Sequence, residues 1–111
     1  MSDTSRVQGG GRPQYTPEEL QKYQQDYQKG FDLFQKSFED FSKPKVEEHK
    51  KAQLQKVMNE ALQVMNETAC VALKEGKQKN EMQLSTDYSE FVQNPTLENQ
   101  KKVSDDINSL K

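Results

Sequence analysis

The two residue types best suited to nucleophilic chemistry occur once each, as Cys70 and His49. A histidine activates a cysteine only when the two side chains lie within hydrogen-bond reach. Both residues fall on one predicted helix, where a rise of 1.5 Å per residue separates them by about 31 Å. The sequence therefore predicts no Cys–His catalytic pair. The helical wheel places Cys70 among polar residues, which predicts an exposed thiol, and His49 near the solvent-facing start of the helix.

The same two residues are too few for a metal centre, because a zinc site needs more His or Cys ligands than one of each. A di-iron helical bundle would need Glu three residues before His in more than one helix, and Val46 holds that position. Gly9-Gly10-Gly11 lacks the preceding strand and the Lys-Ser/Thr pair of a phosphate-binding loop. We expect no catalytic residue, no cofactor, no metal and no small-molecule substrate, and therefore no enzyme.

Charged residues offer two further kinds of chemistry. Acids stand side by side at Glu18-Glu19, Glu47-Glu48 and Asp105-Asp106. Neighbours in sequence do not face each other on a helix, so we expect these carboxylates to be solvated rather than to form acid/base pairs. The best basic cluster consists of Lys50, Lys51 and Lys56. A small helical regulator that contacts nucleic acid through this cluster is the alternative function, although acids interrupt the cluster and make nucleic acid an unfavourable partner.

The strongest pattern in the chain is a stripe of aromatic residues with helical spacing. It comprises Tyr23, Tyr27, Phe31, Phe34, Phe38 and Phe41. At 100° per residue these rings fall in a band roughly 80° wide. The band fits either the core of the chain itself or a seam that binds a second copy or a partner helix. We therefore take the six rings as protein-interaction candidates, and expect any uncovered ring at the Tyr23 and Tyr27 end.

Composition limits the size of the core and the classes of partner. The chain has 111 residues, of which only 31% are hydrophobic, and a net charge of −2. A core built from so few apolar residues favours oligomerisation or a partner protein, and a charge near neutral does not favour DNA or an anionic membrane. No apolar run approaches a membrane span of about 20 residues, and no cleavable signal peptide is visible. We expect a cytoplasmic protein without membrane insertion, and export without a cleaved signal stays open.

The first elements are a tail and a long helix. Residues 1–15 are rich in glycine and polar residues and predict a disordered tail, which leaves residues 16–111 as one helical domain. Thr16 predicts an N-cap, with Pro17 at the first helical position and Glu19 completing a capping box. The helix should extend over residues 17–41, with Gly30 permitting close approach of another backbone.

Three more helices are expected, over residues 45–75, about 78–93 and about 95–110. The second has an apolar face roughly 200° wide and a segment charge opposite to that of its neighbours, so it should lie in the middle. Gly76 predicts its stop, Ser85-Thr86-Asp87 offers an alternative later start for the third helix, and Asn94 and Pro95 should cap and open the last helix. No alternating strand pattern occurs.

Residues 88–100, which read Tyr-Ser-Glu-Phe-Val-Gln-Asn-Pro-Thr-Leu-Glu-Asn-Gln, resemble the helix–Asn-Pro–helix turn of type III secretion needle subunits. That family consists of small helical hairpins that polymerise and are kept soluble by small helical chaperones. The present chain departs from the pattern, because its last helix is only about 15 residues long and a long pair of helices precedes the turn. The resemblance implies a helical hairpin and an association with a secretion apparatus, and identifies no site residue.

Together these patterns predict an all-α protein, a small antiparallel bundle of two long and one or two shorter helices. Its expected function is protein–protein interaction, as a structural, chaperone-like or accessory subunit of a larger assembly, for which a secretion system is the named candidate. The expected partner is another protein or a second copy, bound through apolar helix faces.

Overall fold

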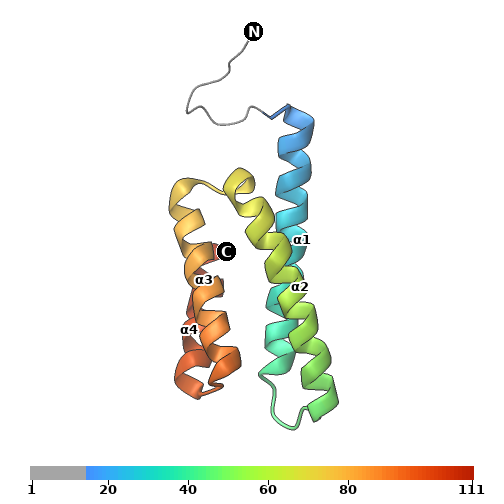
Figure 1. Cartoon of the computed structure of the whole chain (residues 1–111), viewed down its shortest axis with the longest axis vertical. Coiled ribbons are helices and arrows are strands. Elements are labelled where there is room, and N and C mark those ends of the chain that lie inside the picture. Colours follow the sequence, from blue (N-terminus) through green and yellow to red (C-terminus); the bar gives the residue numbers. More distant parts are fainter. Residues whose placement is uncertain (1–14) are drawn as a thin grey trace.

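The computed structural model describes residues 15–111, so the predicted tail, apart from Tyr15, lies outside the described residues. Four helices pack antiparallel in this part of the chain (Figure 1). They are α1 (Pro17–Phe41), α2 (Glu48–Ala72), α3 (Glu75–Gln93) and α4 (Leu97–Leu110). No strand occurs within residues 15–111. The predicted all-α bundle is confirmed, with two long and two shorter helices.

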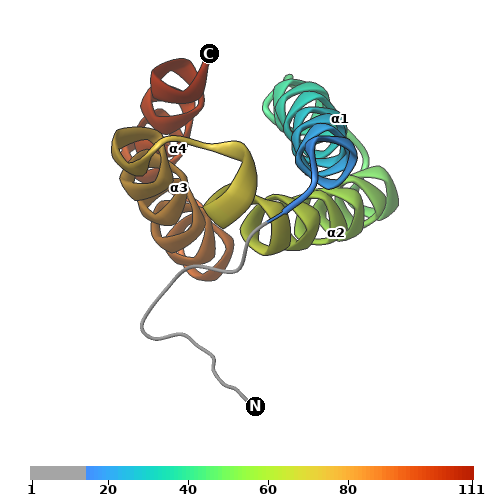
Figure 2. The same cartoon turned by 90° about the horizontal axis from the view of Figure 1, so that it is seen from above.

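The four helices form two hairpins, α1–α2 and α3–α4, which lie side by side in the view from above (Figure 2). The backbone of α2 packs against both α1 and α3, which confirms the predicted middle position of the second helix. Helices α1 and α3 lie diagonally across the bundle, so only long side chains can join them.

Helix α1 begins and ends where the sequence predicts, because its signals are local. The Thr16 hydroxyl accepts a hydrogen bond from the Glu19 backbone N–H at 3.1 Å, and the Glu19 carboxylate accepts one from the Thr16 N–H at 2.9 Å. These reciprocal bonds satisfy two of the free amides at the start of the helix. The Tyr15 ring packs edge-on against Tyr23, so Tyr15 belongs with the helix rather than with the predicted tail.

The turn between α1 and α2 is longer than predicted, and α2 begins at Glu48 rather than near residue 45. The backbone of Lys45 has a φ of 66°, in the left-handed region, which a helix cannot contain. Glu47 is extended and stands at the N-cap position without a side-chain bond to the helix. The turn therefore extends beyond Pro44.

The expectation that the second helix stops at Gly76 is wrong. Leu73 is extended and half-buried against the core, which pulls the chain out of α2 after Ala72. The Gln78 side-chain amide donates to the carbonyl oxygens of Leu73 at 2.8 Å and Cys70 at 3.3 Å, so free carbonyls at this helix end are satisfied. Gly76 lies in the first turn of α3.

The break between α3 and α4 also differs from the prediction. Helix α3 continues through Ser85-Thr86-Asp87 without a restart. Thr96, not Asn94, caps α4, because its hydroxyl accepts from the Asn99 N–H at 3.1 Å. The Asn99 side-chain amide donates to the Asn94 carbonyl at 2.8 Å, which holds the turn in place. Pro95 therefore belongs to the turn and not to the helix.

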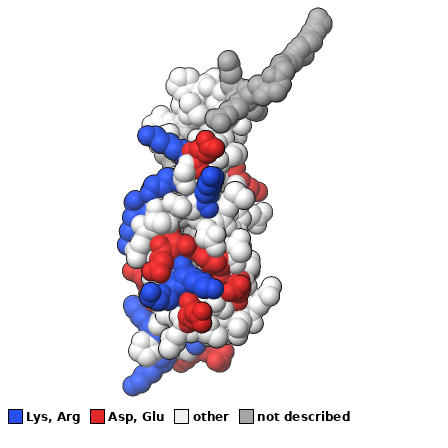
Figure 3. All heavy atoms as spheres, turned by 90° about the vertical axis from the view of Figure 1, so that its left-hand side faces the viewer, with Lys and Arg blue, Asp and Glu red and all other residues white. Residues whose placement is uncertain are grey.

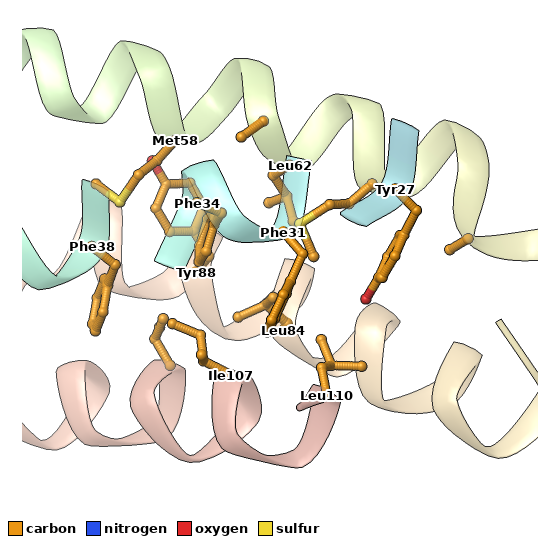
Figure 4. Close-up of a cluster of buried hydrophobic side chains, with 14 of the residues drawn as sticks. Tyr27, Phe31, Phe34, Phe38, Met58, Leu62, Leu84, Tyr88, Ile107 and Leu110 are labelled. Atoms are coloured by element: carbon orange, nitrogen blue, oxygen red, sulfur yellow. The ribbon is translucent and has the colours of Figure 1, made fainter. Parts of the chain in front are cut away.

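The core lies along the axis between the two hairpins (Figure 4). Its fully buried large side chains are Phe34, Met58, Met65, Leu84 and Val103, contributed by all four helices. Aromatic contacts cross the bundle diagonally from α1 to α3. Phe34 meets Tyr88 edge-on at a centroid distance of 5.2 Å, and Phe38 meets Phe91 at 5.8 Å. The rings thus join helices whose backbones are not close neighbours.

Candidate protein-binding groove

The aromatic stripe is mainly core. Tyr27, Phe31, Phe34 and Phe38 are buried, so they cannot reach a partner unless the bundle opens. Tyr23 and Phe41, the two ends of the stripe, are half-buried. The expectation that Tyr27 stands uncovered near the N-terminal end is therefore wrong: its ring stacks with that of Phe31. Any partner surface that includes the stripe must use its ends.

A groove lies between α1 and α2, and its floor is made by small residues. Gly30 of α1 faces Ala61 of α2, and a Cβ atom at Gly30 would stand 3.1 Å from the Ala61 carbonyl oxygen. The missing side chain therefore allows the two helices to approach closely, as the sequence predicts for Gly30. The groove has a volume of about 510 Å³ and is lined by α1 and α2 alone.

Large aliphatic side chains form the walls of this groove. Leu33 of α1 is 49% exposed and Val64 of α2 is 37% exposed, and they stand on either side of the floor. Tyr23, the half-buried ring at the start of the stripe, also lines it. Its charged lining residues are Asp26 and Lys29 on α1 and Glu60 and Glu67 on α2. The groove is thus apolar inside, acidic along its α2 rim and neutral along its α1 rim.

The groove lies at the edge of the broad apolar face of α2, where that face meets α1. Val57, Val64 and Val71 follow at intervals of seven residues along this edge, within about 40° of one another. Val57 and Val71 are half-buried and outside the groove, and Val64 is exposed and lines it. Val64 also stands beside α1, because its Cγ1 atom would lie 3.4 Å from a Cβ atom at Gly30.

The residues that could have supported catalysis lie apart. Cys70 is exposed, as predicted, and His49 is exposed near the α1–α2 turn. The His49 Nδ1 atom stands 3.3 Å from a Glu47 carboxylate oxygen. Among residues 15–111 no group of three or more His, Cys, Asp or Glu side chains could hold a metal ion.

The lysines proposed for nucleic acid have acids beside them. The Lys51 ammonium lies over the Phe41 ring at 5.7 Å, and Lys50 lines a small groove with Lys43 and Lys45 but also with Asp40 and Glu47. On the α3–α4 side of the molecule, acidic and basic side chains are interspersed (Figure 3). Neither arrangement offers the continuous positive surface that phosphate backbones favour.

One of the paired acids is not solvated as predicted. Asp106 of α4 turns toward Asp87 of α3, and its buried Oδ2 atom has no hydrogen-bond partner while both carboxylates are ionised, because neither then has a proton to donate. Burial, followed by the hydrogen bond with Asp87 and the charges of Asp87 and Asp105, raises the pKa of Asp106 to about 7. When protonated, Asp106 can donate to Asp87. Adjacency in sequence gives no sign of this contact, because the partner comes from another helix.

A second acid, Glu81 of α3, is only 3% exposed, and its Oε2 atom is buried without a hydrogen-bond partner. Burial raises the pKa of Glu81. Burial and, secondarily, the Glu81 charge raise the pKa of the Tyr27 hydroxyl. By contrast, the Tyr88 hydroxyl is buried but satisfied, because it donates to Asn59 Oδ1 at 2.6 Å. None of these groups lines the groove between α1 and α2.

Comparison with protein-family models, with curated proteins and with solved structures finds no match. Within residues 15–111 no helix is both long enough and apolar enough to cross a membrane.

Sequence reasoning identified Gly30 and the broad face of α2 but missed Leu33 and Val64 as a pair. A signal was present in α1, where Tyr23, Asp26, Gly30 and Leu33 follow at spacings of three, four and three. These spacings are typical of a helix seam. The larger aromatic stripe, on an adjacent face of the same helix, concealed it.

Proposed function

We propose that this protein is a non-enzymatic protein–protein interaction module, a small helical accessory or structural subunit of a larger assembly. One observation carries the proposal: Leu33 and Val64 are exposed on the two walls of an apolar groove whose floor is Gly30 and Ala61. Exposed apolar surface arranged in a groove is typical of protein-binding sites, whereas scattered apolar residues are not.

The way in which the helices cover one another supports this function. The aromatic rings of α1 are used within the chain, and the α3–α4 hairpin covers one side of α1 and α2 only. The chain has no further helix among its described residues for the other side. A partner helix there would bury apolar side chains that the chain leaves in water, at about 25 cal/mol per Å² of apolar surface.

Features of the possible catalytic groups argue against an enzyme. Asp106, whose pKa is raised, faces Asp87 on another helix. Neither acid lines the groove between α1 and α2, the groove at the α1–α2 turn or the groove between α1 and α4. The contact between the two acids is better explained as part of the helix packing.

A place in a secretion apparatus is the narrower form of the proposal, and the likeness of residues 88–100 to needle subunits supports it. Those residues form the end of α3, the turn and the start of α4. Here the hairpin is packed against α1 and α2 through Tyr88 and Phe91. Helix faces used in this way are not free to polymerise, so an accessory role is favoured over a filament subunit.

Site-specific photocrosslinking tests the proposal. A photoreactive residue placed at Val64 in the full chain, expressed in its source cells, should give discrete adducts with one or a few proteins. Met82, which is 67% exposed on α3, is the matched control and should give few adducts. The proposal fails if Val64 gives no adduct, or if both positions give the same diffuse pattern.

A further inference from the structure

We infer that the groove between α1 and α2 binds a single amphipathic helix of a different protein, with aliphatic side chains on its inner face and Lys or Arg on the edge that meets α2. This inference rests on the function proposed above and adds the chemistry of the partner. Three properties of the groove support it: its length, the shape of its floor and the charge of its rims.

The length of the groove fits a helix of moderate size. The α2 lining extends from Glu60 to Thr68 and the α1 lining from Tyr23 to Leu33, which correspond to about 12 Å and about 15 Å of helix. A partner helix lying along the groove would have about ten residues in contact, with anchors at positions i, i+3 or i+4, and i+7.

The floor selects the side chain at the centre of the partner. Gly30 and Ala61 leave the groove hollow between the walls formed by Leu33 and Val64. A large aliphatic side chain of the partner would fill the hollow and contact both walls. A charged or small side chain at that position would leave either an unpaired charge or an unfilled space.

The rims select the charge of the partner. Asp26 stands on the α1 side, Glu60 and Glu67 stand on the α2 side, and Lys29 is the one basic lining residue. The lining therefore carries a net charge of −2. On the α1 side Asp26 and Lys29 cancel, so the excess negative charge lies on α2, and basic residues on the partner edge that meets α2 would increase specificity and association rate more than affinity.

A second copy of the chain is a poorer occupant for the same reason. A twofold interface would set the same surface against itself, so two linings that each carry a net charge of −2 would be brought together. The apolar lining is also short for a stable dimer, whose interface buries about 1,200 Å² or more.

Designed peptides test the inference. One 16-residue helical peptide carries leucines at the anchor positions and lysines along one edge; its matched partner carries glutamates in place of the lysines. Fluorescence anisotropy with the full chain should show binding of the lysine peptide at least tenfold tighter than that of the glutamate peptide. The difference should shrink at higher salt, because exposed charges are screened.

Two variants locate the binding and test its charge preference. The double substitution Leu33→Ser and Val64→Ser should reduce binding of the lysine peptide at least tenfold, whereas Met82→Ser should not change it. The double substitution Glu60→Lys and Glu67→Lys should reverse the preference toward the glutamate peptide. All changed positions are exposed, and thermal melts of each variant should show that the bundle still folds.

Each other result overturns the inference in a recognisable way. Equal binding of both peptides would contradict charge selection, and absence of binding would contradict the helix-binding groove. A dimer in native mass measurements that dissociates on the serine substitutions would assign the groove to a second copy. In that last case the proposed interaction function would survive, because its own test is the crosslinking at Val64.

Discussion

The two hairpins of this protein have the same topology but join their helices with different chemistry. Between α1 and α2, the contact depends on Gly30, Ala61 and Met65, with no carboxyl group buried between the two helices. Between α3 and α4, Asp87 and Asp106 face each other, and α3 also carries the buried Glu81. One hairpin is therefore held mainly by shape, and the other depends on protonation.

The difference matters because the first hairpin supplies both the core and the proposed binding surface. The aromatic rings of α1 extend across to Tyr88 and Phe91 and hold the second hairpin in place. The second hairpin is the covering element, and its buried acids reduce its stability at neutral pH. Each prediction below perturbs one hairpin and uses the other, or a neighbouring residue, as its control.

The largest effect is expected from Phe34→Ala. Phe34 is fully buried and contacts the rings of Phe38 and Tyr88, so its removal should cost about 3–5 kcal/mol of unfolding free energy. Urea unfolding measures the loss. Leu33→Ala, one residue away and half exposed, should cost less than about 1 kcal/mol. A near-neutral result for Phe34→Ala would contradict its role as core.

A smaller effect is expected from Gly30→Val. The added side chain would begin 3.1 Å from the Ala61 carbonyl oxygen, so the two helices would have to separate, at a cost of about 1–3 kcal/mol. The matched control lies in the other hairpin. A Cβ atom at Gly76 meets nothing within 4 Å, so Gly76→Ala should stabilise by about 0.4–1 kcal/mol. If Gly30→Val also stabilises, close packing at Gly30 is not a requirement of the first hairpin.

The second hairpin should lose stability as pH rises. The pKa of Asp106 is about 7 in the folded chain against 3.8 ordinarily, so the folded state binds more protons between about pH 4 and pH 7. The protonated Asp106 carboxyl contributes fully to stability below about pH 4, and this contribution decreases as the pH rises to about 7. Asp106→Asn replaces the titratable carboxyl with an uncharged amide. After allowance for partial solvent screening, it should raise the unfolding free energy by about 1–2 kcal/mol at pH 8.

Unfolding free energies measured from pH 4 to pH 8 test this prediction. The wild-type profile should decline across the range, and the Asp106→Asn profile should decline less. Glu98→Gln, at an exposed acid of α4, should leave the shape of the profile unchanged. If the wild-type and Asp106→Asn profiles are parallel, the Asp87–Asp106 contact does not control the stability of the second hairpin.

The smallest effects are expected at the helix caps. Thr96→Ala removes the acceptor for the Asn99 N–H in a turn that includes buried Asn99 and should cost about 1 kcal/mol. Thr16→Ala should cost about 0.5 kcal/mol, because the first buried residue of α1 is Tyr27 and the preceding turns can fray without opening the core. Hydrogen exchange should therefore increase locally after Thr16→Ala. A larger cost for Thr16→Ala than for Thr96→Ala would reverse this comparison.

Where structural signals are local, the sequence predicted the structure correctly. Thr16, Pro17 and Glu19 stand within four residues of one another, and the capping box they predict forms. The exposed thiol of Cys70 also follows from the polar residues around it on the same helix. Where a choice depends on another element, the prediction failed, as at Leu73, which ends α2 because it packs against the core. The cap of α4 was also predicted wrongly, although its contacts are local: Thr96 caps the helix, and the Asn99 side chain binds the Asn94 carbonyl.

The same division applies to the candidate site. The width of the apolar face on α2 was visible in the sequence, as was the small residue Gly30 beside the aromatic stripe. Which side of that face stays uncovered depends on where α3 and α4 pack, and no spacing within α1 or α2 encodes it. The Asp87–Asp106 contact was missed for the same reason, since the two acids come from different helices.

The sequence by itself determined that the chain is helical, where α1 begins and ends, and which residues could form a core, because capping and periodicity act within a few turns of one helix. Only the tertiary structure decided that most of the aromatic stripe is buried, that Leu33 and Val64 form the walls of a groove, and that Asp106 faces another acid. Burial and pKa depend on neighbours that are distant along the chain, and packing alone brings those neighbours together.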